Sequence, residues 1–354
     1  MLKIKLTERA DSEILVVGLG LAGKKLQIES TGAQIDTATL LTTLTTMGAT
    51  GEVDEVIKLP SKSNKLIVFT GLGKIESNFS PELLRRAAGA ASRNLLGNEG
   101  ASFALPHKSV AEIAAIAEGA ALGSYSFTEF RGSTKVGQKS PLSSITIVTR
   151  FANTAQAKSA IKRAEIIAEQ TFLVRDLVNT PPSSLTPDSF CLRAKKLASE
   201  YGVKVEVLNE AALRKGGYGG IIGVGQGSVN PPRLLHLSYS PAKAKKRFAF
   251  VGKGITFDTG GLALKPANGM EAMKADMSGA AAVVAAIFAI AQLKLPIAID
   301  AWAPLAENMV SDTATRPSDV ITIYGGKTVE VLNPDAEGRL VLADALVKAA
   351  EVGK

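Results

Sequence analysis

Charged side chains gather in two glycine-rich stretches toward the end of the 354-residue chain, at residues 251–261 and 333–340. Seven residues in or between these stretches could take part in chemistry: Lys253, Asp258, Lys265, Asp276, Asp335, Glu337 and Arg339. The four carboxylates among them could not all remain ionised side by side without cations to neutralise them. Two divalent metal ions would balance their charge, so the set predicts a two-metal site.

The spacing within the second stretch indicates how its side chains are presented. Asp335, Glu337 and Arg339 alternate along the chain, so an extended backbone would direct all three to one side. Gly338 favours that extended backbone, and we expect the following helix to begin near Leu340. The positive N-terminal end of that helix would face an anion bound at Arg339.

The first stretch follows an apolar run that is typical of a strand. Lys253 and Asp258 would then lie at the carboxyl end of that strand, where open α/β sheets bind their ligands. Surface salt bridges among Lys253, Asp258 and Lys265 are the structural alternative. That alternative leaves unexplained a set of glycines that allow close backbone approach, at positions 252, 254, 260, 261 and 338.

The elements that must position these residues alternate along the whole chain. In residues 1–150, runs typical of buried strands and helical patterns follow one another. The strands are expected at 14–17, 66–69 and 145–148, and the helices at 81–96 and 110–122. The alternation predicts an N-terminal α/β domain with a mainly parallel sheet.

Helical spacing over 155–172 predicts a long helix in a linker at residues 151–178. A second domain, 179–354, alternates again, with strands expected at 203–208, 234–239, 248–251, 297–302 and 329–332 and helices at 278–293 and 340–350. The predicted fold class is α/β with two domains, each a mainly parallel or mixed sheet with flanking helices. Because the chain stops directly after a helix, we expect the second domain to be truncated, with an uncovered helix face and sheet edge.

Composition narrows the classes of function. The net charge of +8 is spread in small groups, so a specific nucleic-acid site is weakly supported. The single Cys191 excludes an intrachain disulfide and fits a reducing cytosol, and residues 1–9 lack the apolar core of a signal peptide. The apolar run 279–295 contains Gln292 and Lys294, and it predicts a buried core helix and no membrane span.

Several other motifs have structural interpretations. Gly18-Leu-Gly20-Leu-Ala-Gly23 matches a dinucleotide fingerprint, but the polar sequence after it favours a tight turn over a pyrophosphate-binding helix. The run at residues 71–74 is interpreted in the same way. His107 and His236 are isolated and are expected to be structural. No nucleophile set of Ser, His and Asp or of Cys and His can be argued.

The charged stretches resemble those of a known family, the leucyl (cytosol) aminopeptidases, which are dinuclear metallopeptidases. Residues 333–340, Asn-Pro-Asp-Ala-Glu-Gly-Arg-Leu, resemble the family signature Asn-Thr-Asp-Ala-Glu-Gly-Arg-Leu. Similar segments recur at 175–182, 225–228, 231–233, 270–281, 307–309 and 316–317. The resemblance is clear from about residue 170 to 350 and looser through the N-terminal domain.

The resemblance implies a role for each metal-site residue. Lys253 and Asp276 would bind one metal and Asp335 the other, and Asp258 and Glu337 would contact both. Lys253 would have to be neutral to donate a lone pair, which two adjacent cations and desolvation would enforce. An oxygen-rich site with one amine suits Mn²⁺ as well as Zn²⁺.

The resemblance also implies the reaction. Lys265 would polarise the peptide carbonyl, and Arg339 would hold a bicarbonate-like anion that shuttles the proton. The expected enzyme is a cytoplasmic aminopeptidase that prefers N-terminal Leu on peptides and, if complete, forms a homo-oligomer, which is a hexamer in the family. The alternatives are an inactive fragment or a DNA-binding regulatory relative. Pro334, Val310 and Asp312 depart from the usual Thr, Pro and Gly.

Overall fold

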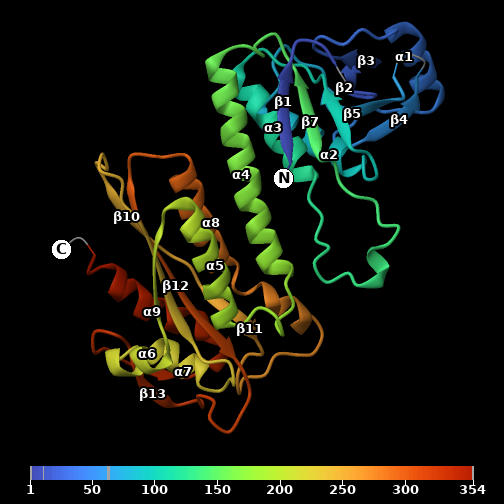
Figure 1. Ribbon diagram of the computed structural model, residues 1–354. Coiled ribbons are helices and arrows are strands. Elements are labelled where there is room, and N and C mark those ends of the chain that lie inside the picture. Colours follow the sequence, from blue (N-terminus) through green and yellow to red (C-terminus); the bar gives the residue numbers. More distant parts are fainter. Residues whose placement is uncertain (1, 11, 62–63, 353–354) are drawn as a thin grey trace. The chain divides into compact units, whose positions relative to one another are not determined.

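The computed structural model describes residues 2–10, 12–61 and 64–352. The chain divides into two compact units, residues 1–172 and 173–354, and each contains its own sheet and helices (Figure 1). Both units mix parallel and antiparallel strands with flanking helices, so the predicted α/β fold class is confirmed. Helix α4 (Ala155–Asn179) extends the helix predicted at 155–172 by seven residues, from 173 to 179.

The first unit is built on a seven-stranded sheet in the order β1-β7-β6-β2-β5-β4, with β3 paired to β2. Strands β3 and β4 are antiparallel to their neighbours, and the other pairings are parallel. The strands are β1 (Lys3–Thr7), β2 (Ile14–Ala22), β3 (Lys25–Glu29), β4 (Val56–Pro60), β5 (Leu66–Lys74), β6 (Gly100–Phe103) and β7 (Ser144–Val148). The mainly parallel sheet expected from the alternation of elements is present.

Helices cover both faces of this sheet. Apolar side chains of α2 (Pro81–Arg93), α3 (Val110–Gly123) and α4 pack with the sheet in one cluster. Leu44 of α1 (Thr37–Thr46) packs with the opposite face. A short 3-10 turn, η1 (Ser133–Lys135), lies between α3 and β7.

The glycines of the apparent dinucleotide motif lie inside a strand and not in a turn. Gly18 and Gly20 belong to β2, where a Cβ would lie 2.4 Å from Leu72 Cδ1 or 2.5 Å from the oxygen of Gly73. Only Gly23, with φ of +64°, makes the predicted turn, and the strand β3 follows it. The run at 71–74 also lies within a strand, β5, so its interpretation as a turn was wrong.

The second unit contains a five-stranded mixed sheet in the order β10-β12-β9-β8, with β11 also paired to β12, and a separate hairpin. Its strands are β8 (Lys204–Leu208), β9 (Arg233–Tyr239), β10 (Arg247–Val251), β11 (Gly254–Asp258), β12 (Ala298–Asn308), β13 (Asp319–Thr322) and β14 (Thr328–Val331). Its helices and 3-10 turns are α5 (Pro187–Tyr201), α6 (Glu210–Gly216), α7 (Gly219–Gly225), η2 (Met270–Ala275), α8 (Ser278–Gln292), η3 (Pro334–Ala336) and α9 (Glu337–Ala349). Helices α5 and α8 pack on one face of the sheet, and α6, α7 and α9 pack on the other.

Strands β10 and β11 lie end to end along the same side of β12, interrupted at Gly252 and Lys253. The break is held in place by α8. A Cβ on Gly252 would lie 2.2 Å from the oxygen of Gly279, and the N–H of Ala280 donates to the oxygen of Lys253 at 2.7 Å. Lys253 therefore leaves the sheet at a fixed point, and Asp258 is the last residue of β11.

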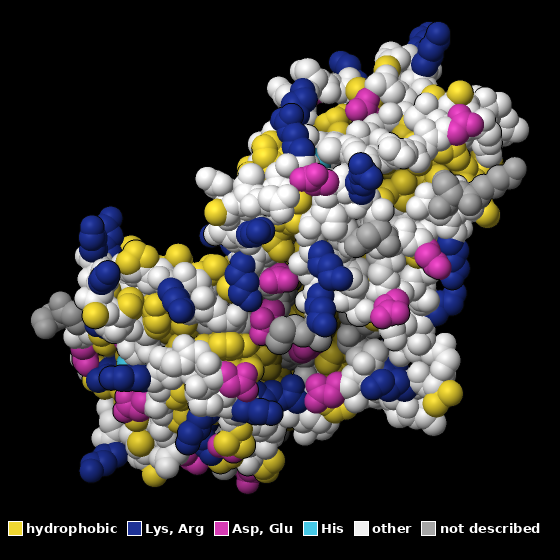
Figure 2. Space-filling view, turned by 45° about the horizontal axis from the view of Figure 1, so that its top comes forward, with side chains coloured by type: hydrophobic (Ala, Val, Ile, Leu, Met, Phe, Trp, Pro, Cys, Tyr) yellow, Lys and Arg dark blue, Asp and Glu magenta, His cyan; other side chains and the backbone are white. Residues whose placement is uncertain are grey.

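The apolar run predicted to be a core helix is α8, whose buried side chains belong to the core of the second unit. The stretch Met270–Gln292 has the length and composition of a membrane span, as core helices of soluble proteins also can. On α9, Leu346 and Val347 are 55% and 39% exposed. Figure 2 shows Lys and Arg side chains scattered over the visible face and not gathered in one patch.

Candidate metal centre

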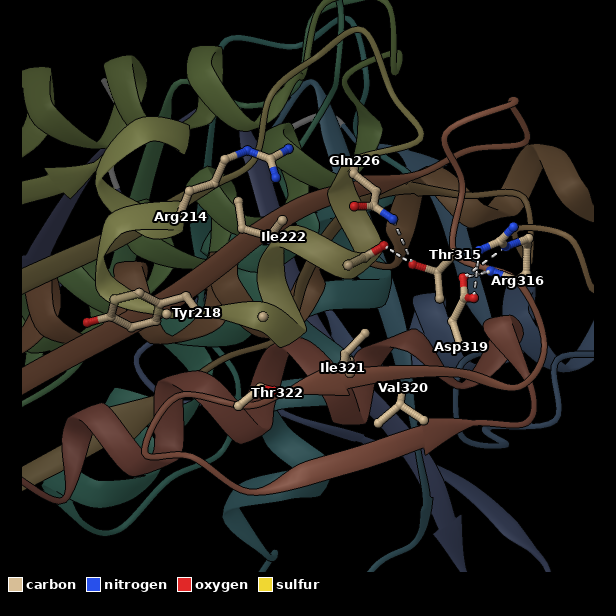
Figure 3. A pocket seen from close by; sticks show the side chains of 13 residues that line it. Arg214, Tyr218, Ile222, Gln226, Thr315, Arg316, Asp319, Val320, Ile321 and Thr322 are labelled. Carbon is tan, nitrogen blue, oxygen red and sulfur yellow. Dashed lines mark hydrogen bonds and ion pairs between the residues drawn. The ribbon is translucent and has the colours of Figure 1, made fainter.

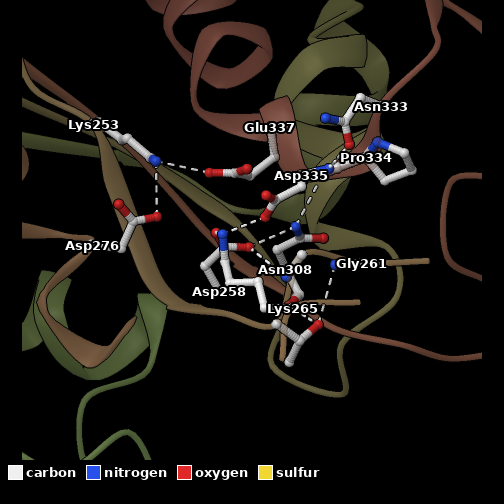
Figure 4. A network of polar contacts seen from close by, with 12 residues as sticks. Lys253, Asp258, Gly261, Lys265, Asp276, Asn308, Asn333, Pro334, Asp335 and Glu337 are labelled. Atoms are coloured by element: carbon white, nitrogen blue, oxygen red, sulfur yellow. Dashed lines mark hydrogen bonds and ion pairs between the residues drawn. The ribbon is translucent and has the colours of Figure 1, made fainter. Parts of the chain in front are cut away.

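Three of the predicted carboxylates come together at the carboxyl end of β11 (Figure 4). One oxygen from each of Asp258, Asp335 and Glu337 lies within 4.8 Å of the other two. Asp258 ends β11, Asp335 lies in η3, and Glu337 begins α9. Asp258 and Glu337 are each only 2% exposed. A group of oxygens in this arrangement could hold a metal ion.

Lys253 reaches the same cluster from the break between β10 and β11. Its Nζ lies 2.8 Å from Oδ2 of Asp276 and 2.8 Å from Oε1 of Glu337. Gly338 leaves room for this approach, because a Cβ there would lie 2.6 Å from Cε of Lys253. Asp276, which follows η2, therefore joins the cluster through Lys253.

Lys265 contacts the other two carboxylates. Its Nζ lies 2.9 Å from Oδ2 of Asp258 and donates a hydrogen bond to Oδ1 of Asp335. Its backbone N–H donates to the oxygen of Thr259 at 2.9 Å, which fixes the loop after β11. Six of the seven predicted residues thus form one network, in which two lysines are shared among four carboxylates.

The second stretch is helical and not extended, so the predicted alternation along one side was wrong. Helix α9 begins at Glu337, before the expected start at Leu340, and the 3-10 turn η3 precedes it. Gly338 belongs to the first turn of α9, where it accommodates Lys253. Arg339 is exposed on that turn, and its side chain forms no ion pair or hydrogen bond with the residues that the structure describes. It is the one predicted residue outside the network.

Burial and ion pairing shift the pKa values of the charged groups in this cluster in opposite directions. Burial opposes the charge of Lys253, but its contacts with Asp276 and Glu337 outweigh burial and raise its pKa. Burial also opposes the charge of Lys265, whose pKa its two carboxylate partners nevertheless raise. Burial raises the pKa values of Asp276 and Glu337, although Lys253 opposes that shift. The carboxylates therefore hold both lysines as ammonium ions.

The donor set fits divalent metal ions. Oδ2 of Asp276 and Oε1 of Glu337 are buried, and each lies 2.8 Å from the ammonium of Lys253. Buried carboxylates need a positive partner, which the ammonium supplies here and a metal ion would also supply. Carboxylate oxygens are ligands for divalent metal ions.

Two asparagines for which the sequence predicted no role also belong to this network. Nδ2 of Asn308 donates to Oδ1 of Asp258 at 2.8 Å. Oδ1 of Asn333 accepts from the backbone N–H of Asp335 at 2.9 Å. Both residues lie in segments that resemble the family, at 307–309 and 333–340, but nothing in their spacing predicts a contact across the cluster.

A groove of about 530 Å³ opens elsewhere in the second unit (Figure 3). It is lined by α7 and by β13, and none of the seven predicted residues lines it. Arg316 at its edge is paired with Asp319 at 3.0 Å. The two histidines also lie outside the metal centre. His107 contacts Leu105 and Thr149, and His236 stacks on Trp302 with ring centroids 3.8 Å apart.

Comparison with known families identifies the class of protein. The model of the cytosol aminopeptidase family, catalytic domain, matches residues 172–354, and that of the N-terminal domain of the same family matches residues 16–134. The chain therefore belongs to the cytosol aminopeptidase family, which makes it a metal-dependent aminopeptidase, as its resemblance implied.

Individual relatives support this membership. A probable cytosol aminopeptidase of Streptomyces avermitilis is 49% identical over 97% of this chain and 70% of its own length. A probable cytosol aminopeptidase of Leifsonia xyli is 47% identical over 97% of this chain and 67% of its own length. The solved structure of the bottromycin maturation enzyme BotP in complex with Mn is 35% identical, with a TM-score of 0.81, and the match covers 97% of this chain and 70% of BotP.

Proposed function

We propose that the chain releases N-terminal residues from peptides, with leucine preferred, at a centre that holds two divalent metal ions. Lys253 and Asp276 would bind one ion and Asp335 the other, while Asp258 and Glu337 would contact both. The observation that carries this proposal is the cluster of three carboxylate oxygens within 4.8 Å, surrounded by two lysines. We propose Mn²⁺ or Zn²⁺, and because the similar enzyme BotP was solved in complex with Mn, Mn²⁺ is the first ion to test.

The bound metals would supply an activated water and Lewis acidity. Lys265 would act on the substrate, because an ammonium has three donors and only two carboxylates contact this one, which leaves a donor for the carbonyl oxygen. Arg339, which is exposed at the positive N-terminal end of α9, would hold a bicarbonate-like anion that carries a proton. Lys253 would bind as a free amine, so metal binding would release its proton.

Peptides in the cytoplasm are the proposed substrates, and a homo-oligomer is the proposed assembly. No contact within the described part of this chain supports either the peptide substrate or the homo-oligomer. No observation favours the DNA-binding alternative, since the basic side chains on the visible face are dispersed (Figure 2).

The proposal is tested by removing single charges from the cluster. Glu337→Gln and Asp335→Asn should lower the Mn²⁺ or Zn²⁺ content, measured by elemental analysis, and abolish hydrolysis of a leucine anilide. Glu330→Gln, which changes an exposed carboxylate on β14, is the matched control and should keep metal and activity.

A content of two metal ions per chain in Glu337→Gln would refute the bridging role of Glu337. Full metal content in the unaltered chain without any peptide hydrolysis would instead support the inactive alternative.

A further inference from the structure

We infer that Asn308 is a positioning residue that sets the distance between Asp258 and the segment that carries Asp335. The inference rests on the proposed function, because it concerns how Asp258 is presented to metal ions. Asn308 is the last residue of β12 and is 5% exposed. Its side chain stands between the loop after β11 and the segment that carries Asp335.

The amide of Asn308 joins these two segments directly. Its Nδ2 donates to Oδ1 of Asp258 at 2.8 Å and to the backbone oxygen of Pro334 at 3.2 Å (Figure 4). Both acceptors are oxygens, so only the nitrogen of the amide can satisfy them, and both of its protons are used. One side chain therefore ties the strand that ends in Asp258 to the turn that carries Asp335.

The backbone of Asn308 holds the same loop. Asn308 pairs with Asp258 in the parallel register of β11 and β12. Its carbonyl oxygen accepts from the N–H of Thr259 at 3.0 Å and from Oγ1 of Thr259 at 2.9 Å. Its Oδ1 lies against Gly261, where a Cβ would be only 2.9 Å away. The side chain thus has little freedom to turn.

The two carboxylate oxygens of Asp258 have different partners. Oδ1 accepts from Nδ2 of Asn308 and also from the N–H of Gly260 at 2.9 Å. Oδ2 lies 2.9 Å from the ammonium of Lys265 and faces the cluster. Since Oδ1 is occupied by two protein donors, Oδ2 is the oxygen left for cations. Groups that orient a ligand in this way commonly change metal affinity when they are removed.

The preceding residue provides a matched control. Glu307 is also buried at the end of β12, but its side chain contacts a different loop. Its Oε2 accepts from Oγ of Ser228 and from Nδ2 of Asn230 at 2.9 Å. A change at Glu307 therefore disturbs the same strand end without touching Asp258 or Pro334.

The experiment compares Asn308→Ala with Glu307→Gln in the full chain. Binding of Mn²⁺ to metal-free protein is followed by the electron paramagnetic resonance signal of free Mn²⁺, and folding by circular dichroism and thermal melting. Asn308→Ala should lose on the order of 10–100-fold in Mn²⁺ affinity, while Glu307→Gln should bind Mn²⁺ as the unaltered chain does. If Asn308→Ala fails to fold, Asn308→Ser, which retains one donor, should show a smaller loss of the same kind.

The outcomes separate this inference from the proposed function. Equal Mn²⁺ affinity in Asn308→Ala and the unaltered chain, with only a lower melting temperature, would overturn the positioning role and leave the metal centre standing. Equal losses in Asn308→Ala and Glu307→Gln would also overturn it, because general damage to β12 would then explain both. An unaltered chain that binds no Mn²⁺ would overturn the proposed function together with the inference.

Discussion

Lys253 and Lys265 carry the same charge, but each contacts a different pair of carboxylates. Lys253 lies between Asp276 and Glu337, and Lys265 contacts the remaining two carboxylates of the cluster. Lys253 emerges from a fixed break in the sheet, whereas Lys265 lies on the loop after β11. We propose a ligand role for Lys253 and a substrate-directed role for Lys265, as the resemblance to the aminopeptidases implies.

At the scale of residues we predict that Lys265→Ala lowers kcat by on the order of 10²–10³-fold, the effect of a lost oxyanion donor. The metal content should remain near that of the unaltered chain, because the proposed ligands are retained. Steady-state kinetics on a leucine anilide and elemental analysis of the same samples check both parts.

Lys327→Ala, a change of an exposed lysine, is the control for loss of charge. If metal and activity disappear together in Lys265→Ala, Lys265 is a ligand or a structural residue, and the division between the two lysines is incorrect.

At the scale of elements, one buried carboxylate links α9 to the segments around it. Asp344 is 0% exposed and accepts hydrogen bonds from the N–H of Ile221 at 2.8 Å and of Tyr324 at 2.7 Å. These contacts tie α9 to α7 and to the turn after β13. Burial raises the pKa of Asp344, and the backbone N–H groups oppose that shift. Because α9 also begins with Glu337, Asp344 helps to hold one wall of the metal centre.

We predict that Asp344→Asn lowers the free energy of unfolding by about 1–3 kcal/mol, the cost of leaving a buried donor without its acceptor. The amide has nearly the same shape as the carboxylate, but its nitrogen would face a backbone N–H. Urea unfolding followed by circular dichroism measures the change. Asp312→Asn, on an exposed segment, should be neutral, and equal stability of the two variants would refute the anchoring role.

At the scale of the whole molecule, each of the two units contains its own hydrophobic clusters. Its two histidines lie one in each unit, so they report on the units independently. The neutral ring of His107 is satisfied on both sides, with Nδ1 donating to the oxygen of Leu105 at 2.9 Å and Nε2 accepting from Oγ1 of Thr149 at 2.8 Å. Burial lowers its pKa below the usual range, although the contact with Leu105 opposes the shift.

A lowered histidine pKa means that the unfolded chain binds the proton more tightly than the folded chain. Stability should therefore fall as the pH drops through about 6.5, the pKa of an unfolded histidine, and should level off below the folded pKa. Imidazole proton resonances, assigned with His107→Gln and His236→Gln, measure the folded pKa, and thermal melting against pH measures the stability. A folded pKa of His107 above that of a free histidine would contradict the prediction.

The residues of the candidate metal centre, apart from Arg339, could be selected from the sequence because their types indicate the chemistry. Four carboxylates and two lysines in glycine-rich stretches favour cation binding where they meet, and periodicity located most of the strands and helices around them. The strand β11 was missed, so Asp258 ends a strand of its own and does not follow the strand predicted at 248–251. The linker at residues 151–178 stays a prediction. The resemblance to the aminopeptidases, carried by residues 333–340, was confirmed by the family comparison.

Only the tertiary structure determined how these residues are presented. Gly338 looked like part of an extended loop, but it lies in α9, and its missing Cβ leaves the space that Lys253, from a distant part of the chain, occupies. The contact of Asn308 with Asp258 depends on the register of β11 against β12. Sequence spacing describes neighbours along one element, whereas these contacts join segments that only folding brings together.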